Sequence, residues 1–558
     1  MPDSVAQISK SPEGRSGPPI RVDSWSVGAL VIAVLVLIPL AAVVWLAMFP
    51  TENVWPHLIS TVLPRYLGNT LMLMAGTGLL AALVGTGAAW LVAMHDFPGR
   101  RWLAWALLLP LSIPAYVGAY ALVDFLEYAG PVQTLLRQTF GWQGARDYWF
   151  PDIRSRGAAV LVIGFTLYPY VYLLARAAFS EQSGAGYEVA RALGAGPWRR
   201  FVAVGLPLAR PAIAAGVAVV MMETVNDFGT VDYFGVQTLT TGIFSVWLSG
   251  GNAGGAAQIA CVILLLIAGL AAAERLSRRR RRFWQAARAQ RPVTRTRLTG
   301  WRGIAATVAC AVPPVLGFAF PAGVMVWHSV TRSAGWLAPG LARAVAHTVV
   351  VGGIASAICV GLALFMVYGV RMTGRALPRT LLPVTNLGYA APGAVLGLGV
   401  LIPLAALDNS VADAVLALTG HDPGLLMTGG IAALVYAYVV RFFAIGQGAT
   451  DAAFGRIPPS LPDAARSLGR GPGGVLRSVH LPLMRGSVAM ALLLVFVDAV
   501  KELPATMLLR PFGYDTLATR VHDQASLERL EQAAPAALVI VAVSLVAVLL
   551  LARADGRR

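Results

Sequence analysis

The chain carries one short pattern twice, and this repetition decides how the whole sequence is organised. The copies are YEVARALGAGP at Tyr187–Pro197 and PDAARSLGRGP at Pro462–Pro472, 275 positions apart. Each is followed by a Leu-Pro pair, and the acidic position keeps its charge as Glu188 and Asp463. Further upstream, Thr70 and Pro114 match Thr348 and Pro392 at an offset of 278. Recurrence over most of each half indicates an internal duplication with both halves in the same orientation.

The composition places most of the chain in a membrane. Of 558 residues, 57% are hydrophobic and only 13% are charged, which is too little charge to cover a soluble protein of this length. Runs of about 20 apolar residues, enough to cross a bilayer, recur throughout the chain. The plainest are Val27–Ala47, Asn69–Met94, Ala158–Leu174 and Ala536–Leu551. We therefore predict an all-α integral membrane protein with about twelve transmembrane helices in two parallel repeats of six.

The net charge of +17 does not indicate nucleic-acid binding, because the arginines lie in short loops between apolar runs. Such loops are typical of the cytoplasmic side of a membrane protein. The basic stretch Glu274–Arg302, with five arginines at Arg278–Arg282, predicts that side near the middle of the chain. Phe228–Ala257 and Ala405–Met427 lack Lys and Arg and are predicted to lie outside. The long loop Gln133–Arg156 is predicted to be a small surface element on the outer side.

These features predict the domain boundaries and the location. We expect a cytoplasmic tail at 1–25, a first half at 26–273, a basic cytoplasmic linker at 274–302 and a second half at 303–553. The transmembrane domain of each half is expected at about 66–272 and 344–551. The expected location is a bacterial inner membrane, crossed many times, with both termini cytoplasmic.

The repeated block also predicts its own local structure. We expect short helices over Gly186–Leu193 and Leu461–Leu468, each starting at an acidic residue that favours the positive end of the helix dipole. Gly194 and Gly469 should end them, as glycine does at a helix C-terminus. Small residues at Ala190 and Ala465 would let another surface approach closely.

The pattern acidic-x-Ala, three residues, Gly, eleven residues, Leu-Pro resembles the EAA loop of binding-protein-dependent ABC importer permeases. The resemblance implies a type I ABC importer fold, in which these loops are coupling helices that dock on ATPase subunits. The residues it implies for coupling are Glu188, Ala190, Arg191, Gly194, Asp463, Ala465, Arg466 and Gly469. It also implies an ABC ATPase dimer, a periplasmic substrate-binding protein and membrane lipid as partners, and no nucleic acid.

The chain has no ATP site of its own by sequence. A Walker A loop needs Gly-Lys-Ser/Thr, and the only lysines, Lys10 and Lys501, do not follow a glycine. We therefore expect no cofactor on this chain, with ATP-Mg bound by a partner ATPase, and a transport subunit that is not an enzyme. Cys261, Cys310 and Cys359 lie in apolar runs without metal-like spacing and are predicted to be core residues.

Five charged residues are candidates for the translocation path. Glu223 and Asp227 are four apart and share a helix face, and Asp498 and Glu502 repeat this arrangement 275 positions later. Four carboxylates that converge at the pore would suit a hard, oxygen-loving cation. Alternatively they form a structural network, in which Lys501 neutralises a neighbouring carboxylate. No metal ligand is assigned.

The substrate prediction comes from a second resemblance. The strings DFGTVDYFGVQTLTTGIF at 227–244 and KELPATMLLRPFGYDTLATRV at 501–521 are similar to those of fused ferric-iron importer permeases. This implies Fe³⁺ delivered by a periplasmic binding protein. The alternatives are a fused ABC permease for thiamine, phosphonate or polyamine, a twelve-span secondary transporter and a membrane-embedded enzyme, although no catalytic cluster is visible for the last.

Overall fold

Long apolar runs form long helices in this protein because a chain in lipid must pair its own backbone N–H and C=O groups. The computed structural model describes residues 24–279, 295–373 and 376–556. Within these ranges, eleven helices are long and apolar enough to cross a membrane. A bent pair, Arg100–Ser112 and Ala115–Phe140, turns by 91° and brings the number to twelve if it forms one span. The prediction of an all-α membrane protein with about twelve spans is confirmed.

The first half runs from α1 to α13. Its helices are α1 (Ser24–Met48), α2 (Trp55–Ser60), α3 (Leu63–Met94), α4 (Arg100–Ala106), α5 (Ala115–Leu126), α6 (Pro131–Phe140), α7 (Arg156–Ser180), α8 (Gly184–Ala192), α9 (Pro197–Arg200), α10 (Leu206–Asn226), α11 (Gly229–Tyr233), α12 (Leu239–Phe244) and α13 (Ala253–Arg279). A 3₁₀ turn, Leu109–Ser112, precedes α5, and π-helical turns occupy Phe201–Gly205 and Ser245–Ser249.

The second half repeats most of this order. Its helices are α14 (Trp301–Pro314), α15 (Phe320–Thr331), α16 (Leu341–Thr373), α17 (Ala376–Val384), α18 (Leu387–Ala390), α19 (Gly393–Thr419), α20 (Ala432–Phe454), α21 (Ser460–Ser467), α22 (Pro472–Val475), α23 (Leu481–Lys501), α24 (Pro504–Leu509), α25 (Leu517–Ser526) and α26 (Leu530–Gly556). π-Helical turns lie at Val315–Ala319 and Leu476–His480, and a 3₁₀ turn lies at Ser333–Leu337.

The same hydrogen bonds, capping boxes and π-helical turns recur in both halves, at the spacings of the sequence repeat. The Leu239 amide donates to Thr70 Oγ1 at 3.0 Å, and the Leu517 amide donates to Thr348 Oγ1 at 2.8 Å. Capping boxes begin α12 at Thr238 and α25 at Thr516. The π-helical turns before α10 and α23 stand 275 positions apart. Related sequences thus form the same local structures in the two halves.

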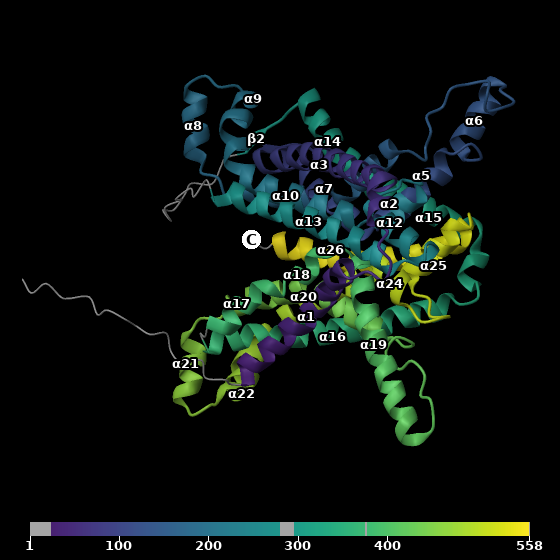
Figure 1. Cartoon of the computed structure of the whole chain (residues 1–558). Coiled ribbons are helices and arrows are strands. Elements are labelled where there is room, and N and C mark those ends of the chain that lie inside the picture. The colour runs from purple at the N-terminus through teal and green to yellow at the C-terminus, as the bar shows by residue number, and fades with distance from the viewer. Residues whose placement is uncertain (1–23, 280–294, 374–375, 557–558) are drawn as a thin grey trace, which may run out of the picture.

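The first spans cross to the opposite half. Helix α1 packs against α16, α17 and α19 as well as α13, and Trp25 stacks on Phe365 with ring centroids 4.6 Å apart. Helices α14 and α15 pack against α4 and α5, and the turn between them touches α7. Gly317 in that turn lies so close to the Phe165 carbonyl that a Cβ would collide with it. The chain order therefore defines two halves that are interlocked in space (Figure 1).

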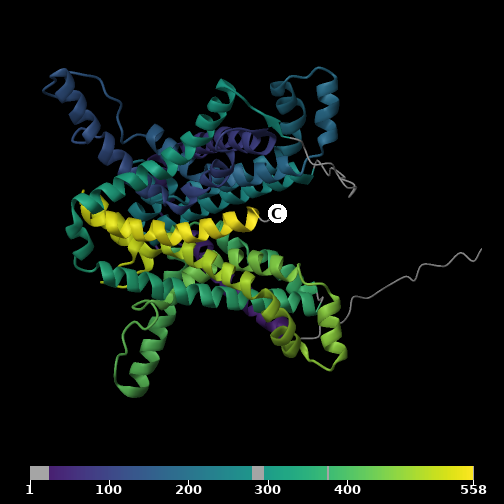
Figure 2. The same ribbon diagram turned by 180° about the vertical axis from the view of Figure 1, so that it is seen from behind.

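The two sides of the molecule carry different loops. Helices α8, α9, α21 and α22 lie on one side, whereas α6 and the end of α19 project from the other, as both views show (Figures 1 and 2). On the α8 side, the strand β1 (His95–Asp96) pairs in parallel with β2 (Thr296–Arg297), so the end of the predicted linker lies beside the end of α3.

The predicted N-terminal tail and linker lie partly outside the residues that the structure describes. Residues 1–23 of the predicted tail and 280–294 of the predicted linker, including Arg280–Arg282, lie outside the described residues. Helix α13 extends to Arg279, so the beginning of the predicted linker continues the last span of the first half. The predicted outer surface element contains α6, and Trp142 stacks on Tyr148 beside it with ring centroids 4.7 Å apart.

Candidate functional site

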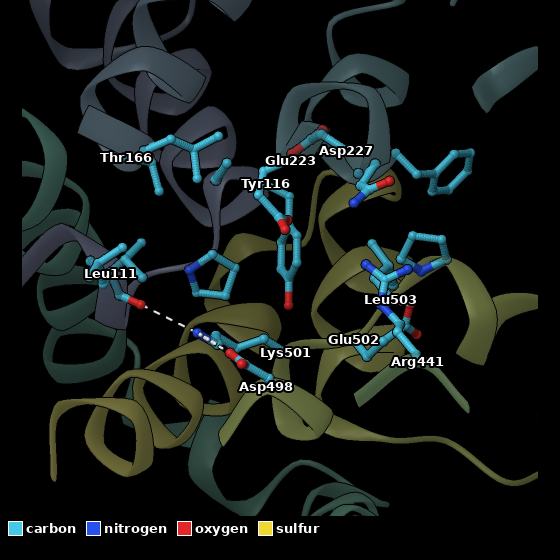
Figure 3. A pocket seen from close by; sticks show the side chains of 18 of the residues that line it. Leu111, Tyr116, Thr166, Glu223, Asp227, Arg441, Asp498, Lys501, Glu502 and Leu503 are labelled. Carbon is cyan, nitrogen blue, oxygen red and sulfur yellow. Dashed lines mark hydrogen bonds and ion pairs between the residues drawn. The ribbon is translucent and has the colours of Figure 1, made fainter. Parts of the chain in front are cut away.

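A cavity of about 180 Å³ lies between the two halves (Figure 3). Its walls come from the segment before α5 and from α7, α10 and α11 of the first half, and from α18, α20, α23 and α24 of the second. Helix α10 has 21 residues, and at about 1.5 Å per residue it spans roughly 30 Å. The cavity, at the far end of α10, is therefore well separated from the loop that contains α8.

All five residues predicted for the translocation path line this cavity. They are Glu223, Asp227, Asp498, Lys501 and Glu502. Each acidic pair comes from the end of a long helix: α10 ends at Asn226 and α23 at Lys501, so Asp227 and Glu502 are the first residues beyond each helix. The structure thus brings together two segments that are 275 positions apart in sequence. That they contact a transported ion stays a prediction.

Asp227 and Glu502 act as helix caps. Asp227 accepts hydrogen bonds from the Thr230 amide at 2.9 Å and the Thr230 hydroxyl at 2.8 Å, at the start of α11. Glu502 accepts from the Ala505 and Thr506 amides, at 3.2 and 3.1 Å, at the start of α24. The first amides of a helix have no intrahelical partner, and a carboxylate satisfies them. These two carboxylates therefore position the short helices that border the cavity.

Glu223 and Asp498, one turn earlier on each helix, have other partners. The Tyr389 hydroxyl donates to Glu223 Oε1 at 3.2 Å. Lys501 Nζ lies 3.2 Å from Asp498 Oδ1 and also donates to the Leu111 carbonyl at 3.3 Å (Figure 3). The predicted neutralisation of a carboxylate by Lys501 is thus present as an ion pair within the second half.

The four carboxylates do not form one metal-binding cluster. Among the described residues, no three His, Cys, Asp or Glu side chains are placed to hold a metal ion together. The expected convergence of the carboxylates on a single cation is therefore not found in this conformation. The reason is local: two of them already accept hydrogen bonds from helix amides, and Asp498 is paired with Lys501.

Sequence reasoning missed Arg441 and the cavity tyrosines. Arg441 Nε lies 3.9 Å from Glu502 Oε1, and its Nη1 is buried without a hydrogen-bond partner among the described residues. Tyr116, Tyr170 and Tyr389 line the same space. A lone arginine in the apolar run that forms α20 is itself a signal of function or pairing. The tyrosines carry no such signal, because only the fold brings α5, α7 and α18 together.

Side chains of α5 and α11 in the first half contact α25 of the second half. The Tyr120 hydroxyl lies 2.9 Å from His522 Nδ1, and His522 Nε2 lies 3.7 Å from Asp232 Oδ2. A single apolar core includes Tyr116 and Val231 from the first half and Leu503 from the second. The halves are thus in close contact at this end of the cavity.

The predicted coupling segments form short helices on one side of the molecule. Helix α8 ends before Gly194 and α21 before Gly469, whose φ angles are +78° and +80°. These left-handed conformations suit glycine, as expected. Their exposed apolar side chains include Leu193 and Leu468, which are 81% and 84% accessible. Such a surface suits a partner protein.

The start of the first coupling helix differs from the prediction. Helix α8 begins at Gly184 with Ser183 as its cap, so Glu188 lies in the second turn, where the helix dipole has little effect. In α21, Asp463 does lie in the first turn, and its Oδ1 pairs with Arg466 Nη1 at 2.9 Å. Ala190 and Ala465 are half-buried at equivalent places, and Arg191 is exposed.

Comparison with known proteins agrees with this architecture. Residues 81–282 match the family described as binding-protein-dependent transport system inner membrane component. The Fe(3+)-transport system permease protein FbpB 2 of Haemophilus influenzae is 23% identical over 490 residues, which cover 87% of this chain and 89% of that protein.

Two Escherichia coli relatives match shorter stretches. The sulfate transport system permease protein CysT is 26% identical over 208 residues, covering 36% of this chain and 70% of its own. The molybdenum transport system permease protein ModB is 29% identical over 177 residues, which cover 31% of this chain and 74% of ModB. The predicted family thus matches the first half of a chain that has enough apolar helices to cross a membrane many times. A ferric-iron permease of similar length aligns with both halves.

Proposed function

We propose that ferric iron is the substrate of this chain, which carries a permease domain of the binding-protein-dependent transport family. One observation carries the proposal: the alignment with a Fe(3+)-transport permease spans 490 residues and includes both halves. A resemblance limited to the permease domain would support the transport class without favouring a substrate.

The chemistry of the cavity supports a cationic substrate. Four carboxylates and two basic residues, Arg441 and Lys501, line it, which leaves an excess of two negative charges when all are ionised. Carboxylate and phenol oxygens are the ligands that hard cations prefer. A transport site must also release its ion, so incomplete coordination by groups already engaged elsewhere is suitable for passage.

The proposed partners occupy opposite sides of the molecule. An ATPase dimer, which would bind ATP-Mg, would dock on α8 and α21, where Leu193 and Leu468 are exposed. A periplasmic binding protein would dock on the opposite side, towards α6 and the end of α19 (Figure 1). ATP-driven movement of the coupling helices would then rock the two halves and expose the cavity to each side in turn. Both termini would be cytoplasmic, at a bacterial inner membrane.

An oxyanion is the second candidate substrate. Arg441 offers a buried, unpartnered Nη1 to the cavity, and sulfate and molybdenum permeases are among the relatives of the first half. The full-length alignment and the excess of carboxylates favour iron over this alternative.

Uptake measurements test the proposal directly. Cells with the ATPase and binding protein present would be assayed for ⁵⁵Fe³⁺ uptake with and without this chain, alongside sulfate, molybdate, thiamine, phosphonate and polyamine. Iron uptake that depends on the chain is expected. Unchanged iron uptake with loss of another solute would refute the substrate and keep the ABC permease. Co-purification of a nucleotide-binding subunit is expected as well, and uptake driven by an ion gradient without it would favour a secondary transporter.

A further inference from the structure

A second cavity lies behind the coupling helix of the first half. It has a volume of about 60 Å³ and is lined by residues of α3, β1, α8, α9 and β2. Its polar lining residues are His95, Tyr187, Glu188, Arg191, Arg200 and Thr296. Since about 10–15 Å³ suffices for one water, the space can hold several waters or one small ion.

The lining is basic, and two of its donor groups lack partners. His95 is only 8% exposed, and its Nδ1 has no hydrogen-bond partner among the described residues. The Nε of Arg200 is likewise buried without a partner there. Burial, and then the nearby Arg200 guanidinium, lower the pKa of His95, whereas the ring's approach to the Trp90 backbone opposes this shift. Buried polar groups are normally hydrogen-bonded, so these two groups indicate an absent ligand.

The other polar groups of the lining do not meet this need. The Tyr187 hydroxyl donates to Gln182 Oε1, and Gln182 in turn donates to the Gly205 carbonyl at 3.1 Å. Glu188 also lines the cavity, but its side chain is exposed to solvent. Arg295, next to β2, adds further positive charge, and its Nε donates to the Ala93 carbonyl at 3.3 Å.

The second half does not repeat this arrangement. The positions equivalent to His95 and Arg200 are Thr373 and Val475. The position of Trp90 is held by Tyr368, whose hydroxyl donates to the Pro472 carbonyl at 2.6 Å. The residues of the basic cavity are therefore particular to the first half, whereas in the second half a different histidine, His480, is buried beside Tyr368, and its Nδ1 has no hydrogen-bond partner among the described residues.

We propose that this cavity binds a small oxyanion of the phosphate type, held by His95, Arg200 and Arg191. Arginine donates paired hydrogen bonds that match the geometry of phosphate oxygens. The ligand would be either free phosphate or a phosphate headgroup of an anionic lipid, since the site lies at the end of a membrane span. An anion there would connect α8 to the end of α3 and to β2.

Thermal stability of the purified chain tests this site. In phosphatidylcholine nanodiscs, the unfolding midpoint would be followed as inorganic phosphate is added, with sodium chloride at equal ionic strength as the reference. A second arm compares nanodiscs with and without phosphatidylglycerol, in the absence of phosphate. A ligand that binds only the folded state raises the midpoint as its concentration increases.

Two variants and a matched control decide the result. Arg200→Gln and His95→Gln should each weaken the effect about tenfold in half-maximal concentration, as loss of a hydrogen bond to a charged group does. Arg199→Gln removes the same charge from an exposed neighbour and should bind like the unaltered chain. If Arg200→Gln does not fold, His95→Gln serves alone.

Each outcome bears on the proposal. Stabilisation by phosphate that is lost in Arg200→Gln or His95→Gln and kept in Arg199→Gln supports a free anion. The same pattern only with phosphatidylglycerol supports a lipid headgroup. No stabilisation in either arm, or equal loss in Arg199→Gln, would show that the cavity holds only water. No substrate is needed, so the test is independent of the proposed iron transport.

Discussion

The two halves of the chain share the same helix ends and caps but place different charges in the central cavity. Each half ends its long helix with a carboxylate pair, and the second carboxylate of each pair caps the following short helix. The first half adds only acids, together with Asn226 and Thr166, whereas the equivalent positions in the second half are Lys501 and Arg441. The two halves thus share this framework, whereas the charges that line the cavity differ between them.

The largest expected difference concerns the two capping carboxylates. Glu502 is only 5% exposed and lies 3.9 Å from Arg441, whereas Asp227 has no ion-pair partner in the part of the chain that the structure describes. Glu502→Ala should lower the free energy of unfolding by about 3–5 kcal/mol, because it leaves the Arg441 charge buried without its carboxylate partner. Asp227→Ala should cost about 0.5–2 kcal/mol, as loss of a helix cap does. Unfolding of the detergent-solubilised protein would measure both.

A double variant sharpens that comparison. Glu502→Ala with Arg441→Met removes both charges and should recover part of the lost stability. Equal losses for Glu502→Ala and Asp227→Ala would mean that the ion pair with Arg441 adds nothing to the cap.

The second prediction compares the coupling glycines. Valine at Gly194 or Gly469 must adopt a φ near +80°, at a cost of about 1–2 kcal/mol, although no neighbouring atom obstructs a side chain there. We expect transport to fall roughly tenfold in each variant, with expression maintained and ATP hydrolysis by the partner continuing.

Gly196 provides the matched control for this pair. It also has open space around it, but its φ is −65°, so Gly196→Val should transport normally. Normal transport by Gly194→Val or Gly469→Val at full expression would refute the coupling role. A defect in only one of them would show that the halves couple unequally.

The third prediction concerns Lys501, a cation that the first half replaces with Asn226. Asp498→Asn leaves Lys501 without its partner, which lies 3.2 Å away. One extra positive charge about 10 Å from a passing cation costs about 1.7 kcal/mol per unit charge of that cation at an effective dielectric constant of about 20. Iron uptake should therefore fall more than tenfold, and Glu223→Gln, whose carboxylate accepts from the Tyr389 hydroxyl, tests the loss of the same charge in the first half.

Adding Lys501→Asn to Asp498→Asn makes this position resemble Asn226 of the first half and should restore much of the uptake. If the double variant transports no better than Asp498→Asn, the charge of Lys501 is not the cause. Equal uptake in Asp498→Asn and the unaltered chain would leave the ion pair a structural role only.

The smallest difference between the halves is expected at the two equivalent threonines. Thr70→Val and Thr348→Val each remove the acceptor of a buried leucine amide, at a cost of about 1–3 kcal/mol. Because the two hydrogen bonds are equivalent, the unfolding midpoints should shift by similar amounts. A shift in only one variant would show that the preserved geometry has a different energetic role in each half.

Much of this architecture could be predicted because it depends on local sequence. Apolar runs of about 20 residues predict spans, and the left-handed glycines Gly194 and Gly469 follow from the repeated block. The pairing of Asp498 with Lys501 follows from their spacing of three on one helix.

Other features depend on packing between distant segments. Arg441 and Tyr389 enter the cavity only because α18 and α20 pack beside α10 and α23, and nothing local predicts the crossing of α1 to the second half. The capping role of Asp227 had a local signal that was missed: aspartate is among the residue types that most often accept from the first amides of a helix. Attention to the carboxylates as ion ligands hid their function as caps.

The crossed first spans have a consequence for the integrity of the fused chain. Helix α1 packs against α16 and α19 of the second half as well as α13 of its own, while α14 packs against α3 and α4 of the first half and α15 against α5 as well as α26. The covalent linker is therefore not what holds the halves together, because separating them would require stripping each of a helix that belongs to the other. A single proteolytic cut between residues 280 and 294 should leave two fragments that elute as one particle in detergent.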